Sequence, residues 1–99
     1  GSIRSNHYHK TDWHFITVVL GTLHYYWRPA GSKERPNMAI FRIGDTFFTG
    51  PEIEHAVYSP RASEIVTMSR LSRRHDTHES DLVRVPLIKL EGDEIVVCK

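Results

Sequence analysis

Short apolar runs, rich in β-branched and aromatic residues, alternate with glycine and proline along most of the chain. Two of these runs, 15–20 and 22–27, are separated only by Gly21, which indicates a tight turn or a bulge between two strands. Further runs predict strands at 38–43, 46–49, 55–58, 64–69, 82–88 and 94–98. Short strands at such regular spacing predict an all-β sandwich or barrel.

Two segments interrupt this pattern. The stretch 29–37 is polar and contains two prolines and a glycine, so we expect a loop there. The stretch 72–81 is polar and rich in arginine, histidine and acidic residues, and we expect a surface excursion with one or two helical turns. Pro86 cannot donate a backbone hydrogen bond, which places the run 82–88 at a sheet edge.

Length and composition are those of one small globular domain. The 99 residues are 39% hydrophobic and 25% charged, and we expect a single domain over 1–99, with Gly1 and Ser2 resembling the remnant of a cleaved expression tag. The net charge of +1 gives no support for binding to nucleic acid. Cys98 is the only cysteine, which rules out an internal disulfide and a cysteine-based zinc cluster.

Hydropathy points to an aqueous location. No run of the sequence reaches the roughly 18–20 apolar residues that cross a bilayer. No signal-peptide pattern opens the chain. We therefore expect a cytoplasmic protein that does not insert into a membrane.

The histidines are the main candidate for chemistry, since the chain contains seven of them. His7 and His9 are two residues apart, a spacing that puts both side chains on one face of a strand. His14 opens the next strand, and His55 follows much later, after a Gly-Pro turn. Four imidazoles that converge in a barrel predict a site for a divalent transition metal, which is Zn, Fe, Ni, Mn or Cu. Two alternatives stay open at the same residues, namely metal-free acid–base histidines and structural histidines.

The spacing of these residues resembles the cupins, a superfamily of double-stranded β-helix (jelly-roll) barrels. Their first motif is similar to His7-Tyr8-His9, four residues, His14, six residues and Gly21. Their second motif is similar to Gly44, five residues, Gly50-Pro51-Glu52, two residues, His55, three residues and Ser59. The resemblance implies an all-β cupin barrel with a core at about 4–71 and a C-terminal extension at 72–99.

A closer resemblance exists within the cupins. The opening Arg4-Ser5-Asn6-His7-Tyr8-His9-Lys10 resembles that of cupins in bacterial nucleotide-sugar metabolism, such as the 3,4-ketoisomerases. The late run 69–84, from Ser69-Arg70-Leu71 through Glu79-Ser80-Asp81-Leu82-Val83-Arg84, is similar to the tail of small polysaccharide-biosynthesis cupins. This likeness implies a nucleotide-sugar ligand, with His7 and His9 as catalytic proton carriers that need no metal.

Three positions depart from the cupin pattern. His14 stands where the family has a carboxylate ligand, and Ser59 replaces an asparagine. The Gly50-Pro51-Glu52 turn replaces Pro-x-Gly. The first departure matters most, because four neutral imidazoles would leave the charge of a divalent metal uncompensated. Such a site favours an anionic ligand or hydroxide at its open position.

Other candidates follow from side-chain alternation along the strands. Tyr25, if it shares the inward face with Leu23 and Trp27, is a candidate substrate-binding residue, since sugars stack on aromatic rings. Lys10 and Arg70 are candidates to bind an anionic substrate group. With His14 pointing inward, alternation predicts that Ile16, Val18 and Leu20 also face the interior, and that Val57 shares the face of His55.

The opposite faces, with Phe15, Val19 and Tyr26, are too apolar for water, and we expect a second subunit to cover them in a homodimer.

These observations favour a metal-binding cupin that acts on or binds a small polar metabolite. A nucleotide sugar of surface-polysaccharide biosynthesis is the expected ligand, with isomerase- or epimerase-like chemistry, although the sequence leaves open whether the protein is an enzyme. The alternatives are a metal-free histidine acid–base isomerase, a non-catalytic ligand-binding or sensory module, and an iron-dependent dioxygenase.

Overall fold

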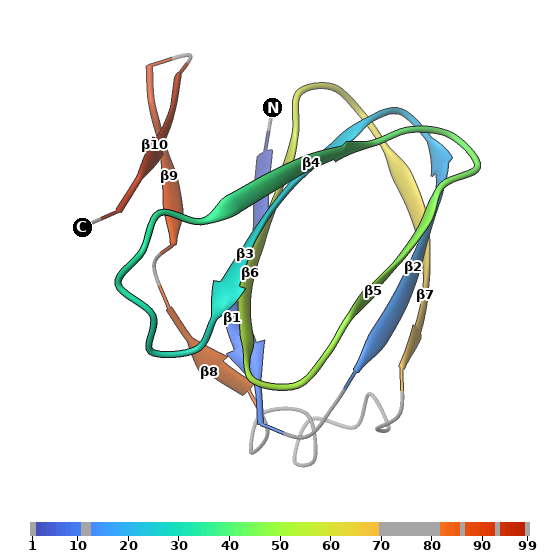
Figure 1. Ribbon diagram of the computed structural model, residues 1–99. Helices are drawn as coiled ribbons and strands as arrows, with labels where there is room; N and C mark the ends of the chain where they lie inside the picture. The colour runs from blue at the N-terminus through green and yellow to red at the C-terminus, as the bar shows by residue number, and fades with distance from the viewer. Residues whose placement is uncertain (1, 11–12, 70–81, 86, 93, 99) are drawn as a thin grey trace.

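The computed structural model describes residues 2–10, 13–69, 82–85, 87–92 and 94–98. The segment 72–81, which we expected to contain helical turns, lies outside the described residues, as does Arg70. The described residues form ten strands (Figure 1): β1 (Ser2–His9), β2 (His14–Leu20), β3 (Leu23–Pro29), β4 (Asn37–Phe41), β5 (Thr46–Thr49), β6 (Ile53–Ser59), β7 (Glu64–Ser69), β8 (Leu82–Arg84), β9 (Ile88–Glu91) and β10 (Glu94–Val97). They include no helix long and apolar enough to span a lipid bilayer.

The strands pair into three antiparallel sheets. A five-stranded sheet has the order β4-β3-β6-β1-β8, and a three-stranded sheet has the order β5-β2-β7. These two sheets face each other and enclose the interior of a barrel (Figure 1). The third sheet is the hairpin β9–β10, which lies beside the barrel. The predicted all-β barrel is therefore confirmed.

The turn between β2 and β3 depends on a glycine, as the sequence indicated. Gly21 has a φ of +84°, and a Cβ atom there would lie 2.7 Å from the carbonyl oxygen of Ala62. Any side chain at this position would collide with the backbone that leads into β7.

The predicted run 82–88 is not one strand, because it supplies β8 and only the first residue of β9. Pro86, which has no N–H to donate, lies between the two strands in the sequence.

The barrel interior is filled by apolar side chains from both large sheets. Its buried members are Ile16, Val18, Leu23, Tyr25, Phe47 and Val57. The alternation that predicted Ile16, Val18 and Val57 inside is confirmed, but it is wrong for Leu20, which is 49% exposed. The register of β2 against β7 shifts between Val18 and Leu20, and this irregularity turns the end of β2 outward.

Around β6, the outer face of the five-stranded sheet is covered by the chain itself. Ala56 on β6 is fully buried against Leu87 and Ile88, and Tyr26 packs on the same cluster. The expectation that a second subunit covers Tyr26 is thus wrong, because the C-terminal segment occupies that place.

The loop between β3 and β4 is anchored by a buried carboxylate. Glu54 is 5% exposed and accepts hydrogen bonds from Arg28 Nε at 2.8 Å and from the backbone N–H of Gly31 at 3.0 Å. A buried carboxylate is costly unless it is paired, so these bonds fix the start of the loop against β6.

Candidate functional site

The candidate site lies at one end of the barrel, where strands from both sheets begin or end (Figure 1). β1 ends at His9 and β2 begins at His14. β5 ends at Thr49, and the following turn leads into β6, which carries His55 near its start. Residues that are far apart in sequence are therefore gathered at this end by the strand topology.

His7 and His55 meet directly inside the five-stranded sheet. They lie opposite each other in the pairing of β1 with β6, and their ring centroids are 4.7 Å apart at an interplanar angle of 79°. The register of β1 shifts between Arg4 and His7, so that three steps along β1 match two along β6. Bulges of this kind redirect side chains beside functional sites. Here the bulge brings the imidazole of His7 to the face of His55.

A backbone carbonyl orients the imidazole of His55. Its Nδ1 lies 3.1 Å from the carbonyl oxygen of Ile53. Because a carbonyl can only accept, Nδ1 must carry the proton, and Nε2 holds the lone pair in the neutral ring. His55 is only 4% exposed. The arrangement gives a buried imidazole with a defined basic nitrogen.

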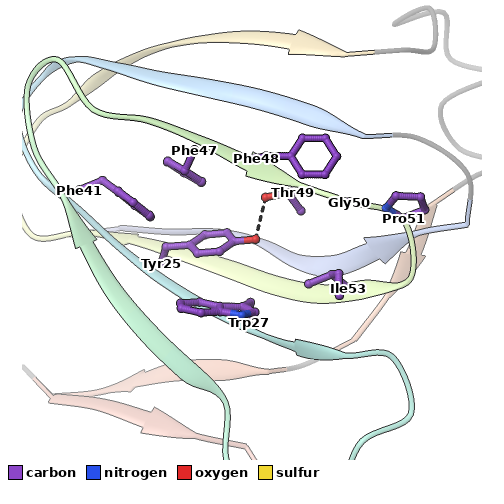
Figure 2. A pocket seen from close by; sticks show the side chains of 9 residues that line it. All are labelled: Tyr25, Trp27, Phe41, Phe47, Phe48, Thr49, Gly50, Pro51 and Ile53. Atoms are coloured by element: carbon purple, nitrogen blue, oxygen red, sulfur yellow. Dashed lines mark hydrogen bonds between the residues drawn. The ribbon is translucent and has the colours of Figure 1, made fainter.

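A hydrogen bond across the barrel links the two sheets next to the histidines. The hydroxyl of Tyr25 on β3 and Oγ1 of Thr49 on β5 are 2.6 Å apart (Figure 2). Burial raises the pKa of Tyr25 to about 12, so this phenol stays protonated at neutral pH. The Tyr25 ring centroid lies 6.1 Å from that of His55. His14, 6% exposed, lies opposite Thr49 in the pairing of β2 with β5.

An aromatic cavity of about 540 Å³ opens beside these residues, a size that suits a small molecule. Figure 2 shows Tyr25 and Trp27 along one side, with Phe48 and Pro51 toward the turn after β5. The rings of Tyr25 and Trp27 are stacked, with centroids 5.3 Å apart. The described residues that line the cavity are Tyr25, Trp27, Phe41, Phe47, Phe48, Thr49, Gly50, Pro51 and Ile53, and none of these carries a charge.

The turn after β5 adopts a conformation that explains one departure from the cupin pattern. Glu52 has a φ of +60°, and its carbonyl oxygen accepts a hydrogen bond of 2.8 Å from the N–H of Ala30. A turn with Pro51 followed by a residue of positive φ has the sequence signature of type II, whose third position favours glycine. Glu52 occupies the position of the glycine in the Pro-x-Gly motif. The backbone therefore keeps a left-handed residue there although the side chain has changed.

The candidate residues fall into three groups. His7 and His55 are in contact, and His14 lies on the facing sheet, on the inward-facing row of Ile16 and Val18. Lys10 is exposed just beyond β1. The backbone of His9 ends β1, but the structure does not describe its side chain, and it does not describe Arg70 at all.

The described residues do not by themselves form the predicted metal cage. Within the part of the chain that the structure describes, no group of three or more His, Cys, Asp or Glu side chains lies close enough to hold a metal ion. The donors brought together there are a pair of imidazoles, His7 and His55. A metal site in a protein generally has at least three protein ligands, and this pair supplies two. Metal binding at these histidines therefore stays a prediction.

Two residues of this region were missed by the sequence analysis. Thr49 follows Phe47 on the inward face of β5, so alternation along that strand was a usable signal. Arg84 lies opposite His7 in the pairing of β1 with β8. No local pattern identifies it, because this pairing joins residues more than seventy positions apart.

Comparison with known proteins identifies the fold. No protein-family model and no curated protein matches this sequence. Among solved structures, the chain is similar to the QdtA 3,4-ketoisomerase from Thermoanaerobacterium thermosaccharolyticum, a double mutant in complex with TDP, with a TM-score of 0.69 and 13% sequence identity. The match covers 84% of this chain and 56% of the ketoisomerase chain.

The fold is therefore the cupin jelly-roll barrel that the two histidine motifs predicted. The solved structure that it resembles is a 3,4-ketoisomerase with a bound nucleotide.

Proposed function

We propose that the protein is a cupin that binds a nucleotide sugar of surface-polysaccharide biosynthesis and shifts a proton on its sugar ring, as an isomerase or epimerase. The observation that carries the proposal is the His7–His55 pair beside an aromatic cavity of small-molecule size. The likeness in fold to a 3,4-ketoisomerase crystallised with TDP supports the same class of ligand. The cytoplasmic location expected from the sequence belongs to this proposal.

The cavity suits the sugar part of such a ligand. The C–H faces of a sugar ring pack well on aromatic rings, and the stacked Tyr25 and Trp27 offer such a surface. The hydroxyls of Tyr25 and Thr49 supply polar atoms at the same wall. A mostly apolar pocket with a few convergent polar groups orients a small ligand. The proposal therefore includes Tyr25 as a substrate-binding residue, as the sequence predicted.

The histidines supply the acid and the base that the reaction needs. Moving a ketone from C4 to C3 of a sugar removes the proton from C3, protonates the carbonyl oxygen O4, and gives an enediol. Loss of the O3 proton and protonation of C4 complete the change, with no oxidant or reductant. Imidazole exchanges protons near neutral pH. Nε2 of His55 is suited to accept the carbon-bound proton, with His7, or His9 as the sequence suggests, as its proton partner.

The test is isomerisation of a TDP-linked 4-keto sugar in D₂O, followed by NMR. We expect a 3-keto product that carries deuterium from solvent at C4. His7→Gln and His55→Gln should each lower the rate by roughly 10²–10⁴-fold, the usual contribution of an acid–base group. His24→Gln is the matched control, because His24 packs on Tyr58 rather than on the site. Binding of TDP without isomerisation or deuterium exchange would refute catalysis and favour a non-catalytic binding module.

A metal-dependent version of this function has its own support. His55 donates its Nδ1 proton to a backbone carbonyl, which is how metal-ligating histidines are commonly held. A divalent transition metal, held by His7, His9, His14 and His55, would supply Lewis acidity toward a carbonyl oxygen. Elemental analysis of the purified protein tests this version. We expect stoichiometric metal that His14→Ala removes, and fully folded, active protein without metal would refute it.

A further inference from the structure

A row of paired residues crosses the five-stranded sheet at the site. Arg84 on β8 lies opposite His7 on β1, and His7 lies opposite His55 on β6. His55 in turn lies opposite Trp27 on β3, which lines the aromatic cavity. Directly opposite residues of antiparallel strands project from the same face of a sheet. The row thus runs on one face from an aromatic side chain through two imidazoles to a guanidinium.

The position of Arg84 in the row sets the distance between its backbone and that of His55. Neighbouring strands lie about 4.8 Å apart, so the backbone of Arg84 is about 10 Å from that of His55, two strands away. The side chain of Arg84 is exposed, whereas His55 is buried. The row therefore leads from the barrel interior to solvent at the edge strand β8.

The phosphates of a nucleotide sugar bound in the aromatic cavity would need a cationic side chain outside that cavity. A nucleotide sugar carries a diphosphate next to C1 of the sugar, but the described lining of the cavity has no charged side chain. In the proposed binding mode the sugar lies in the cavity with its reacting carbons at His7 and His55, and the phosphates extend away from Trp27 toward the edge strand β8. The row leads in that direction to Arg84.

We infer that Arg84 binds the phosphate next to the sugar and so selects nucleotide-linked sugars over free sugars; the inference rests on the proposed function. A guanidinium presents a planar fork of donors that matches phosphate oxygens, and this geometry is not reproduced by lysine. Its five N–H groups allow it to bind a phosphate while keeping another acceptor. Arg84 is thus a specificity residue that takes no part in the proton transfer.

The experiment compares ligands with and without phosphates. Dissociation constants of TDP and of thymidine are measured by NMR titration for the native protein, Arg84→Gln, Arg84→Lys and the control Arg42→Gln. Arg42 is exposed beyond β4, in the turn that Asp45 closes, and lies away from the row. We expect Arg84→Gln to weaken TDP binding about tenfold or more, with Arg84→Lys in between. Thymidine binding, and both ligands with Arg42→Gln, should remain unchanged.

The outcomes separate this inference from the proposed function. If the native protein binds TDP and isomerises the sugar, but Arg84→Gln binds TDP as well as Arg42→Gln does, the inference is wrong and the function stands. An equal loss of TDP and thymidine affinity in Arg84→Gln would also overturn it, because the side chain would then act on the whole site. If the native protein does not bind TDP, both the inference and the nucleotide-sugar function are wrong. Circular dichroism of each variant verifies that it is folded.

Discussion

The two large sheets of the barrel differ in what covers their outer faces. The five-stranded sheet has Ala56 fully buried beneath Leu87 and Ile88 of the C-terminal segment. The three-stranded sheet leaves large apolar side chains in contact with solvent, with Phe15 44% and Met68 65% exposed. Within one small chain, the sheet that carries the His7–His55 pair is thus covered on its outer face around β6, whereas its edge strand β4 leaves Met38 and Ile40 exposed.

This difference suits the two sheets to different roles, one as a support for the histidine pair and the other as a surface for association. Ala56 and Val57 are neighbours on β6 and both are buried, so β6 is packed on both of its faces, and close packing positions functional side chains well. The exposed face of the other sheet, where the rings of Phe15 and Phe48 are 5.1 Å apart, has the character of a surface for association. The expected homodimer stays a prediction for this face, and it no longer concerns Tyr26.

The largest loss of stability at neutral pH should follow from removing a side chain that covers the five-stranded sheet. Leu87 is fully buried in the outer cluster, and we expect Leu87→Ala to lower the free energy of unfolding by about 3 kcal/mol, through lost burial and the cavity left behind. Urea denaturation followed by tryptophan fluorescence measures this change. A loss well below 1 kcal/mol would show that the C-terminal segment does not stabilise the barrel.

Phe15→Ala is the matched control on the uncovered face. Because Phe15 is 44% exposed in the single chain, its removal should cost a monomer only about 1 kcal/mol. If a second copy covers this face, stability will depend on protein concentration, and Phe15→Glu will convert dimer to monomer in sedimentation experiments. A monomer at all concentrations would contradict the homodimer.

The link between the sheets should give an intermediate effect. Tyr25→Phe removes the hydrogen bond to Thr49 and leaves a buried hydroxyl without it, at an expected cost of about 1–2 kcal/mol at neutral pH. Urea denaturation of both proteins at pH 7 measures this cost. Equal stability there would mean that the cross-barrel bond contributes nothing.

The same tyrosine should make stability depend on alkaline pH. Its pKa is about 12 in the folded protein, against an ordinary pKa of 10.0 for tyrosine, so the folded state holds the proton that the unfolded state loses in this range. Stability should therefore fall as pH rises from 10 to 12, by up to about 3 kcal/mol from this group. Denaturation at intervals between pH 9 and 12 should show a shallower loss for Tyr25→Phe, because that variant lacks the group. Parallel curves for the two proteins would contradict the prediction.

The smallest effect should come from the turn that carries the chain from one sheet to the other. Glu52 is exposed and has a positive φ, which costs a non-glycine residue about 1–2 kcal/mol. Glycine removes that cost but gains freedom in the unfolded chain, so Glu52→Gly should stabilise the protein by about 0.5–1 kcal/mol. Thermal unfolding measures the shift. A lower melting temperature would mean that the Glu52 side chain itself contributes to the fold.

Much of the fold could be predicted from local pattern. Alternation identified the inward side chains of Ile16, Val18 and Val57 because their strands pair regularly there. It was wrong for Leu20, where the register slips, and slips of register leave no mark in the hydrophobic pattern. The cover on Tyr26 was misassigned for a different reason, since alternation shows that a face is apolar but not what packs on it.

The candidate site was predictable to the extent that motifs carry it. The two histidine motifs indicated that His7 and His55 would meet, and the structure brings their rings together. Arg84 was out of reach, because only the pairing of β8 with β1 makes it a neighbour of His7. Contacts of this kind depend on long-range topology, whereas sequence patterns report on residues a few positions apart.

The bulge in β1 has a consequence for how this strand tolerates change. Ile3 and His7 are four positions apart, and strict alternation would point both in the same direction. The extra residue instead allows Ile3 to pack in the outer cluster while His7 faces the interior. The two halves of this one strand therefore have different roles, since the first packs in the outer cluster and the second carries His7 into the interior. Selection or protein engineering can therefore adjust the packing of Ile3 in the first half without moving the imidazole of His7 in the second.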